Sequence, residues 1–324
     1  MGDRRNAAYI WTVVALAVLA ALSVIPTPFY LLAPGGAVDL STRIVVAGYG
    51  APKRRLYLTD VVLARASVLM LAGVAIPGVR VVRRDTVMPA GESARGFGAA
   101  MDDAMGESQN VAAIVAERAA GFRVARSPSR VCVVDIRATP GGEPVLHPGD
   151  CFERVGMRRI DDTAGLVRAV AALGRAFVAK VRVRRDGRSI ELDVPTVPVI
   201  RGVRLGVRVR ERTPPASLPV AVRYTIGDVA GSSGGLMFAL QIYAALRGLD
   251  GPGGIAGSGT IALDGAVGPI EGARQKYIAA QRAGATTFLV PARNAAEILH
   301  ERGPRIVAVR SFGEALRVLE ERTP

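Results

Sequence analysis

The pattern of hydrophobic and polar positions first separates the amino end from the rest of the chain. An uncharged apolar run extends from Ala7 to Ile25 and follows two arginines. At about 1.5 Å per residue this run nearly matches a hydrocarbon core of ~30 Å. It predicts one transmembrane helix over residues 7–28 of a single-pass cell-membrane protein. Residues 1–6 are then cytoplasmic and the body extracytoplasmic, because arginines favour the cytoplasmic side. A cleaved signal peptide is the alternative.

The remaining chain reads as three consecutive parts. Residues 35–121 contain a strand-like run and then a long helical pattern from Phe97 to Ala120. Residues 123–197 are predicted to form a β-rich module with one helix. Its stretch AKVRVRRDGRSIELDVP alternates with period two on both sides of an Asp-Gly pair, which indicates a hairpin. Residues 198–324 alternate between helical and extended segments. This alternation predicts an α/β domain.

Charge and composition narrow the classes of function. The chain has 50% hydrophobic residues and a net charge of +14, which comes almost wholly from scattered arginines. No nucleic-acid reader motif accompanies them, so a nucleic-acid partner is not expected. Only three lysines occur: Lys53, Lys180 and Lys276. A buried lysine can lose its proton at a useful pH, whereas an arginine cannot.

The chain has too few histidines and cysteines for a histidine-based catalytic triad or a typical metal site. The two histidines, His147 and His300, have no ligand-like neighbours, so neither a Ser-His-Asp triad nor a metal site is expected. No cofactor is expected either. Cys132 and Cys151 flank a turn. They form either a disulfide or two small buried side chains, and the sequence leaves both open.

The stretch GDVAGSSGGLMFAL carries the candidate chemistry. A flexible linker would not run straight into an apolar helix, and a phosphate loop would need Gly-Lys-Ser/Thr, which is absent. The remaining interpretation is a nucleophilic serine beside backbone amides that stabilise an oxyanion. Its base would be a lysine made neutral by burial, and Lys276 is the lysine of that domain. A solvated surface lysine is the plain alternative.

At these residues the sequence resembles the proteolytic domain of the Lon family. The segments that carry the resemblance are AGSSGGLMFAL, IAGSGTIALDGAVGPIEGARQKYIAAQRAGATTFLVP and PARNAAEI. The resemblance implies that Ser233, not Ser232, is the nucleophile and that Lys276, 43 residues later, is the general base. It also puts Ser258 where the family has a hydroxyl residue near that lysine.

The supporting residues of the turn depart from the family pattern. The amides around Gly231 to Gly234 are expected to hold the oxyanion, with Ser232 and Ser258 in support. Ser232 stands where the family has proline, Gly234 where it has alanine, and Ala230 where it often has an acidic residue. Such changes can alter the rigidity of the turn.

The middle module is similar to a PDZ domain through LHPGDCFERVGMRRIDDTAGLVRAV. The preceding MGESQNVAAIVAERAA resembles a helix of the first half of the Lon proteolytic domain, which implies that the PDZ domain is inserted. The whole therefore resembles the bacterial membrane-anchored, PDZ-containing Lon-like proteases. The expected fold is an α/β (α+β) Lon-type proteolytic domain with an inserted PDZ domain and one transmembrane helix.

The function expected from this resemblance is an ATP-independent serine endopeptidase that cleaves exported or membrane-associated proteins. Its expected partners are polypeptide substrates, peptide segments held by strand addition to the PDZ domain, the lipid bilayer and further copies of the chain in a ring. The alternative is an inactive PDZ scaffold that binds peptide tails at the membrane surface.

Overall fold

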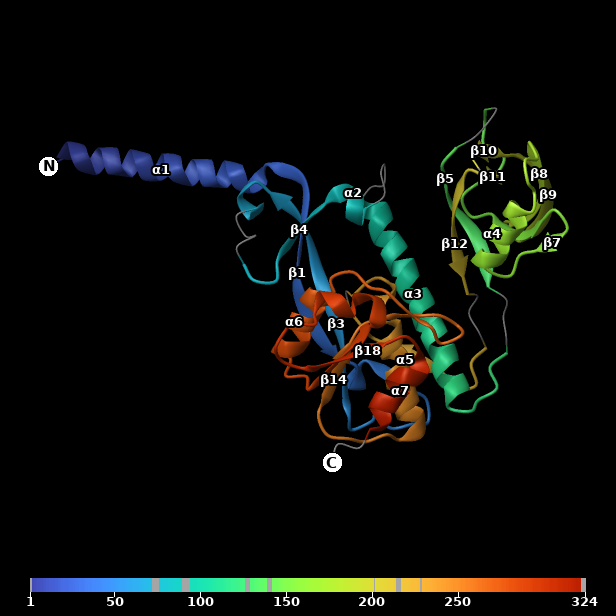
Figure 1. Cartoon of the computed structure of the whole chain (residues 1–324). Coiled ribbons are helices and arrows are strands. Elements are labelled where there is room, and N and C mark those ends of the chain that lie inside the picture. The colour runs from blue at the N-terminus through green and yellow to red at the C-terminus, as the bar shows by residue number, and fades with distance from the viewer. Residues whose placement is uncertain are drawn as a thin grey trace. The chain divides into compact units, whose positions relative to one another are not determined.

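The computed structural model describes residues 2–71, 76–88, 94–125, 129–138, 142–200, 202–213, 217–227 and 229–321. The chain divides into two compact units (Figure 1). Unit 1 comprises Met1–Val124 and Leu218–Pro324, and unit 2 comprises Ala125–Ser217. Unit 2 is therefore an insertion within the sequence of unit 1.

The amino-terminal helix differs from the expected anchor. Helix α1 spans Gly2–Val24, and strand β1 begins at Pro26, which already pairs with Ser67. Residues 7–28 are thus divided between a helix and a strand. Within the part of the chain that the structure describes, no helix is long and apolar enough to cross a membrane. The predicted transmembrane helix, and the single-pass membrane placement that depended on it, are wrong.

Unit 1 is built on a six-stranded mixed sheet in the order β18-β17-β14-β3-β1-β4 (Figure 1). Its strands are β1 (Pro26–Asp39), β3 (Arg55–Ser67), β4 (Arg80–Arg83), β14 (Gly254–Gly257), β17 (Thr287–Pro291) and β18 (Arg305–Val309). Strands β3, β14, β17 and β18 are mutually parallel, whereas β1 is antiparallel to β3 and β4. Strand β17 is buried throughout, as a strand inside a parallel sheet requires.

Helices and short elements complete unit 1. The helices are α2 (Arg84–Val87), α3 (Ala94–Ala119), α5 (Gly235–Arg247), α6 (Ala273–Arg282) and α7 (Phe312–Glu320). Shorter turns are η1 (Leu40–Thr42), η3 (Ser232–Gly234) and η4 (Ala292–Glu297), and the small strands are β2 (Ile44–Val46), β13 (Val222–Tyr224), β15 (Thr260–Ile261) and β16 (Val267–Gly268). The helical patterns expected before the middle module and after the Gly-Ser turn are confirmed as α3 and α5.

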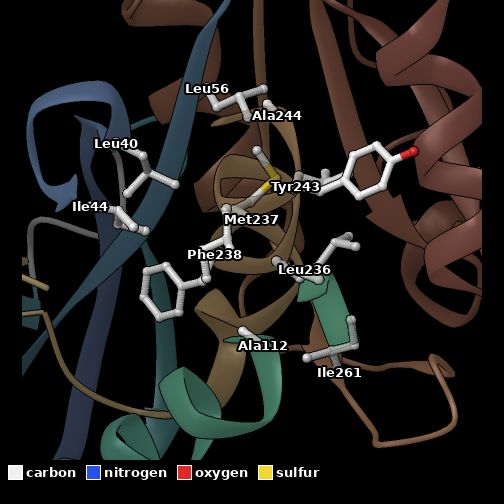
Figure 2. Packing of buried hydrophobic residues seen from close by; sticks show 14 of the residues in the cluster. Leu40, Ile44, Leu56, Ala112, Leu236, Met237, Phe238, Tyr243, Ala244 and Ile261 are labelled. Carbon is white, nitrogen blue, oxygen red and sulfur yellow. The ribbon is translucent and has the colours of Figure 1, made fainter. Parts of the chain in front are cut away.

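Helix α5 is the centre of the hydrophobic core of unit 1. Every residue from Gly235 to Ala245 is buried, which fits a helix that is apolar on all sides. Figure 2 shows Leu40, Ile44 and Leu56 packed near α5, with Ala112 of α3 on another side. Because α5 is enclosed in this way, the Gly-Ser turn at its amino end is held by a close-packed core.

The described residues of unit 2 form a β-sheet that packs against one helix, α4. Its elements are β5 (Arg130–Ile136), β6 (Cys151–Val155), β7 (Arg158–Arg159), α4 (Thr163–Ala171), β8 (Val178–Arg185), β9 (Arg188–Pro195), β10 (Val197–Val199), β11 (Gly202–Arg204) and β12 (Val207–Arg212). The main sheet has the order β12-β5-β6-β8-β9, so this unit extends past residue 197 because β12 pairs with β5.

Unit 2 contains the predicted hairpin and also shows how its two cysteines are arranged. The β8–β9 hairpin is confirmed, and its turn residues Asp186 and Gly187 both have positive φ, as a two-residue hairpin turn of type I′ requires. Cys132 and Cys151 lie opposite each other on β5 and β6 and form a disulfide. The open question about the two cysteines is therefore answered by this cross-strand pair.

Candidate active site

The Gly-Ser turn lies at the amino end of α5. Gly231 has a φ of +93°, in the left-handed region that favours glycine, and its N–H donates to the carbonyl of Met101 at 3.0 Å. The turn then forms η3 and continues directly into α5. Ser233 is half-buried at this junction. The tight backbone path thus fixes one serine at the start of a buried helix.

Packing explains why position 234 is a glycine. A Cβ added to Gly234 would lie 2.7 Å from Cζ of Phe238 and 3.3 Å from Cδ1 of Leu58. Phe238 is fully buried on α5, so its ring has little freedom to retreat. The departure from the family's alanine is therefore matched by the large aromatic ring one helical turn later.

Lys276 reaches the Gly-Ser turn from helix α6. Its side chain is only 3% exposed, and its Nζ donates to the Oγ of Ser233 at 2.7 Å and to the Oγ of Ser258 at 2.9 Å. Ser258 is itself fully buried and follows β14. The amine thus bridges two hydroxyls that come from separate segments of the chain.

Ser258 also supports the backbone of the candidate nucleophile. Its Oγ donates to the carbonyl of Ser233 at 2.9 Å, and the N–H of Gly259 donates to the same carbonyl at 2.7 Å. The N–H of Leu236 in turn donates to the carbonyl of Gly259 at 3.0 Å. These bonds couple the turn to the segment after β14, so the two hydroxyls keep a fixed separation from the amine.

The environment of Lys276 favours the neutral amine. Burial lowers the pKa of Lys276 from its ordinary value of 10.5 to about 8, because the charged form loses its hydration. The negative charges of Asp60 and Glu271 oppose this effect and raise the pKa. Desolvation is the larger influence. Near neutral pH the lysine is therefore poised to exchange a proton with a hydroxyl beside it.

Two contacts from α3 hold the turn and were not identified from the sequence. Ser108 is buried, and its Oγ donates to the carbonyl of Ser232 at 3.0 Å. The carbonyl of Met101, also on α3, accepts the N–H of Gly231. The segment MGESQN had indicated a helix of the proteolytic domain, but a single mid-helix serine gives no sign of a contact 124 residues away.

The structure brings some of the predicted site residues into contact and leaves Ser232 outside that cluster. Ser233, Lys276 and Ser258 form one hydrogen-bonded cluster. Ser232 is exposed. The amide of Gly231 already donates to the Met101 carbonyl. Within the described ranges, no three His, Cys, Asp or Glu side chains gather where they could hold a metal ion.

Comparison with known proteins agrees with this geometry. Residues 226–307 match the Lon protease (S16) C-terminal proteolytic domain. That range includes the whole hydrogen-bonded cluster. The chain is also 36% identical over 97 residues to a Lon protease of Chloroflexus aggregans, over 28% of this chain and 12% of that relative. It therefore spans only about an eighth of the length of the relative it matches. The predicted likeness to the Lon proteolytic domain is confirmed over residues 226–307, and it supports serine protease activity.

A comparison with solved structures finds one further likeness. The PDZ domain of the SdrC-like protein from Listeria monocytogenes aligns with 27% of this chain and 93% of that domain, at 13% identity and a TM-score of 0.22. At that TM-score the alignment carries no weight for the fold. The expected PDZ domain stays a prediction.

Proposed function

We propose that this protein is a serine endopeptidase that cleaves polypeptides with a Ser233–Lys276 dyad and without nucleotide hydrolysis. The observation that carries the proposal is the 2.7 Å contact between Nζ of Lys276 and Oγ of Ser233, made by a lysine that is buried and has a pKa of about 8.

The proposed reaction begins with neutral Lys276. Ser233 Oγ attacks the carbonyl carbon of the scissile peptide bond while Lys276 Nζ accepts the hydroxyl proton. The tetrahedral intermediate collapses, the C–N bond breaks, and Lys276 gives its proton to the departing amine. A water molecule then attacks the acyl-serine ester with Lys276 again as base. The second product leaves as a carboxylic acid and the serine is restored.

Backbone amides of the turn are proposed to stabilise the oxyanion. The first amides of a helical turn have no intrahelical acceptor, and in η3 these belong to Ser232 and Ser233. The amide of Gly231 is occupied by the Met101 carbonyl, and that of Gly235 by the Ser232 carbonyl. The oxygen of the intermediate would therefore face the amides of Ser232 and Ser233.

Unit 2 is proposed to capture polypeptide segments by strand addition. Strand β12 is one edge of its sheet, and among the residues that the structure describes it pairs only with β5. Helix α4 is tied to the same strand, since the N–H and Oγ1 of Thr163 both donate to Oε2 of Glu211, at 2.9 and 3.0 Å. A peptide added to β12 would lie beside α4. Assembly into a ring is a further proposal, taken from the resemblance alone.

The test is cleavage of an unfolded, fluorescently labelled protein by the full chain without nucleotide. Ser233→Ala is expected to remove cleavage, because the attacking oxygen is lost. Ser232→Ala is the matched control one residue away, and it should retain most of the activity because that hydroxyl is exposed. Cleavage that survives Ser233→Ala would refute the proposal.

A binding scaffold without catalysis is the second candidate. The exposed serine at 232 and the glycine at 234, where the family has proline and alanine, are the observations in its favour. If the protein is a scaffold, the wild-type protein and the Lys276→Arg variant should bind peptide tails equally well, and neither should cleave them. A peptidase would lose cleavage in that variant, because arginine does not act as a base.

A further inference from the structure

Positive charge is concentrated in unit 2. Its 93 residues carry 18 Lys and Arg against 10 Asp and Glu, which gives +8 of the chain's net +14. On β8 the charged side chains of Lys180, Arg182 and Arg184 alternate with the buried Val181 and Val183. The core of the unit lies on the valine side, so these basic side chains occupy the outer face of the sheet.

A hollow of about 330 Å³ lies on this outer face. Five of its lining residues are arginines, namely Arg130, Arg154, Arg159, Arg182 and Arg184. Only two lining residues are acidic, Glu153 and Asp161. We call this group of five side chains the arginine hollow. Its lining has an excess of positive charge.

The strand register places arginines directly opposite one another. Arg154 on β6 pairs with Arg159 on β7 and with Arg182 on β8. Like charges at directly opposite positions destabilise a sheet. A sequence selected for stability alone would put an acidic or neutral residue between two such arginines. The repeated cation is therefore unfavourable within the sheet alone, and a bound anion would relieve the repulsion.

Ion pairs neutralise only part of the arginine hollow. Arg184 pairs with Glu153 at 2.6 Å, Arg159 with Asp161 at 2.9 Å, and Arg182 with Glu191. Arg130 and Arg154 have no ion-pair partner among the residues that the structure describes. Two guanidinium groups thus remain available, and each can hold a carboxylate through two parallel hydrogen bonds.

We propose that the arginine hollow binds an acidic polypeptide segment in extended conformation. Alternate side chains of an extended peptide repeat about every 6.6–6.8 Å. Arg182 and Arg184, two residues apart on one strand, have the same repeat. The aromatic residue of the lining, Phe152, is 2% exposed and offers no ring on which a nucleic-acid base could stack. The inference rests on the proposed function only in taking polypeptide as the ligand.

The test is fluorescence anisotropy with the full chain in a Ser233→Ala background, so that binding is scored without cleavage. The probe is a labelled twelve-residue Glu-Ser repeat, and a Gln-Ser repeat of equal length is its neutral control. The Glu-Ser peptide should bind at least about tenfold more tightly, and its affinity should fall as salt is raised. Equal binding of both peptides would overturn the proposal.

Substitutions of single arginines test whether the acidic peptide binds in the arginine hollow. Arg154→Gln should weaken binding of the Glu-Ser peptide about tenfold. Arg154→Lys keeps the charge but loses the paired N–H donors of the guanidinium, so it should weaken binding less. Arg175→Gln is the matched control, since that arginine is exposed in the same unit but does not line the hollow. Equal losses in Arg154→Gln and Arg175→Gln would contradict the inference, as would a twelve-residue oligothymidylate that binds more tightly than the acidic peptide.

The outcomes separate this inference from the proposed function. If wild type cleaves an unfolded protein and the acidic peptide shows no preference, the docking inference fails alone. If the acidic peptide binds and wild type does not cleave, the peptidase proposal fails alone.

Discussion

The pKa of Lys276 gives the sharpest prediction for activity. Only the neutral amine can accept the Ser233 proton, and burial brings the pKa from 10.5 to about 8. At pH 7 about one tenth of the molecules then hold a neutral lysine, against roughly three in ten thousand for an ordinary lysine. Burial thus raises the active fraction about 300-fold at pH 7. The value of kcat/KM should rise about tenfold per pH unit below pH 7 and level off above about pH 9.

The assay is the initial rate of cleavage of a short fluorogenic peptide from pH 6 to pH 10 at subsaturating concentration. Its midpoint should report the pKa of the free enzyme's base. Glu271→Gln tests the assignment, because the negative charge at Glu271 raises the pKa of Lys276. Removing that charge should move the midpoint to lower pH. Glu271 is mostly exposed, so the displacement should be well under one pH unit and should shrink with salt.

Two results would refute this reasoning. One is a rate that stays flat between pH 6 and pH 9 while the protein remains folded. The other is an active Lys276→Arg variant, because arginine keeps its proton throughout this range. Loss of at least about a hundredfold in kcat/KM is expected for Lys276→Arg.

Three further predictions concern the surroundings of the dyad. Ser258→Ala removes the hydroxyl that accepts from Lys276, so kcat should fall about 10- to 100-fold with little change in KM, measured by steady-state kinetics. Gly234→Ala puts a methyl 2.7 Å from the ring of Phe238, and thermal unfolding should show a loss of about 1–3 kcal/mol. Glu117 is fully buried and its pKa is raised by desolvation, so the unfolded chain ionises at lower pH than the folded one. Stability should therefore fall as pH rises above about 4.5, and thermal melts of Glu117→Gln over the same pH range should lack that slope.

The proposed catalytic residues could be predicted from the sequence because lysine is scarce in this chain and because the serine lies in a recognisable local pattern. A lysine in a chain that otherwise uses arginine, and a serine in a glycine turn before an apolar helix, are both visible without a structure. Ser233 and Lys276 were paired by resemblance, and the structure brings them within hydrogen-bond distance. Ser258 was found in the same way.

The contacts that support the site were less accessible because they join distant segments. The Ser108 hydroxyl meets the Ser232 carbonyl across 124 residues, and no periodicity marks such a pair. The occupied amide of Gly231 depends on where α3 passes, which the sequence pattern does not specify.

Apolar content alone misled the prediction for the amino end. The hydrophobic pattern predicts one element over residues 7–28, but the helix ends at Val24 and Pro26 begins a strand that pairs with β3. Proline lacks the N–H that a helix interior needs, and this local signal outweighs average hydrophobicity. The predicted module likewise ends before β12, because the pairing of β12 with β5 depends on a partner far back in the chain.

The most direct test of the central claim is the identity of the acylated residue. The full chain would be mixed with a peptide thioester, quenched in acid during turnover, and mapped by mass spectrometry for an acyl adduct. The account predicts one adduct on the peptide that contains Ser232 and Ser233, lost in Ser233→Ala and retained in Ser232→Ala. An adduct that persists in Ser233→Ala, or that disappears only in Ser232→Ala, would contradict it.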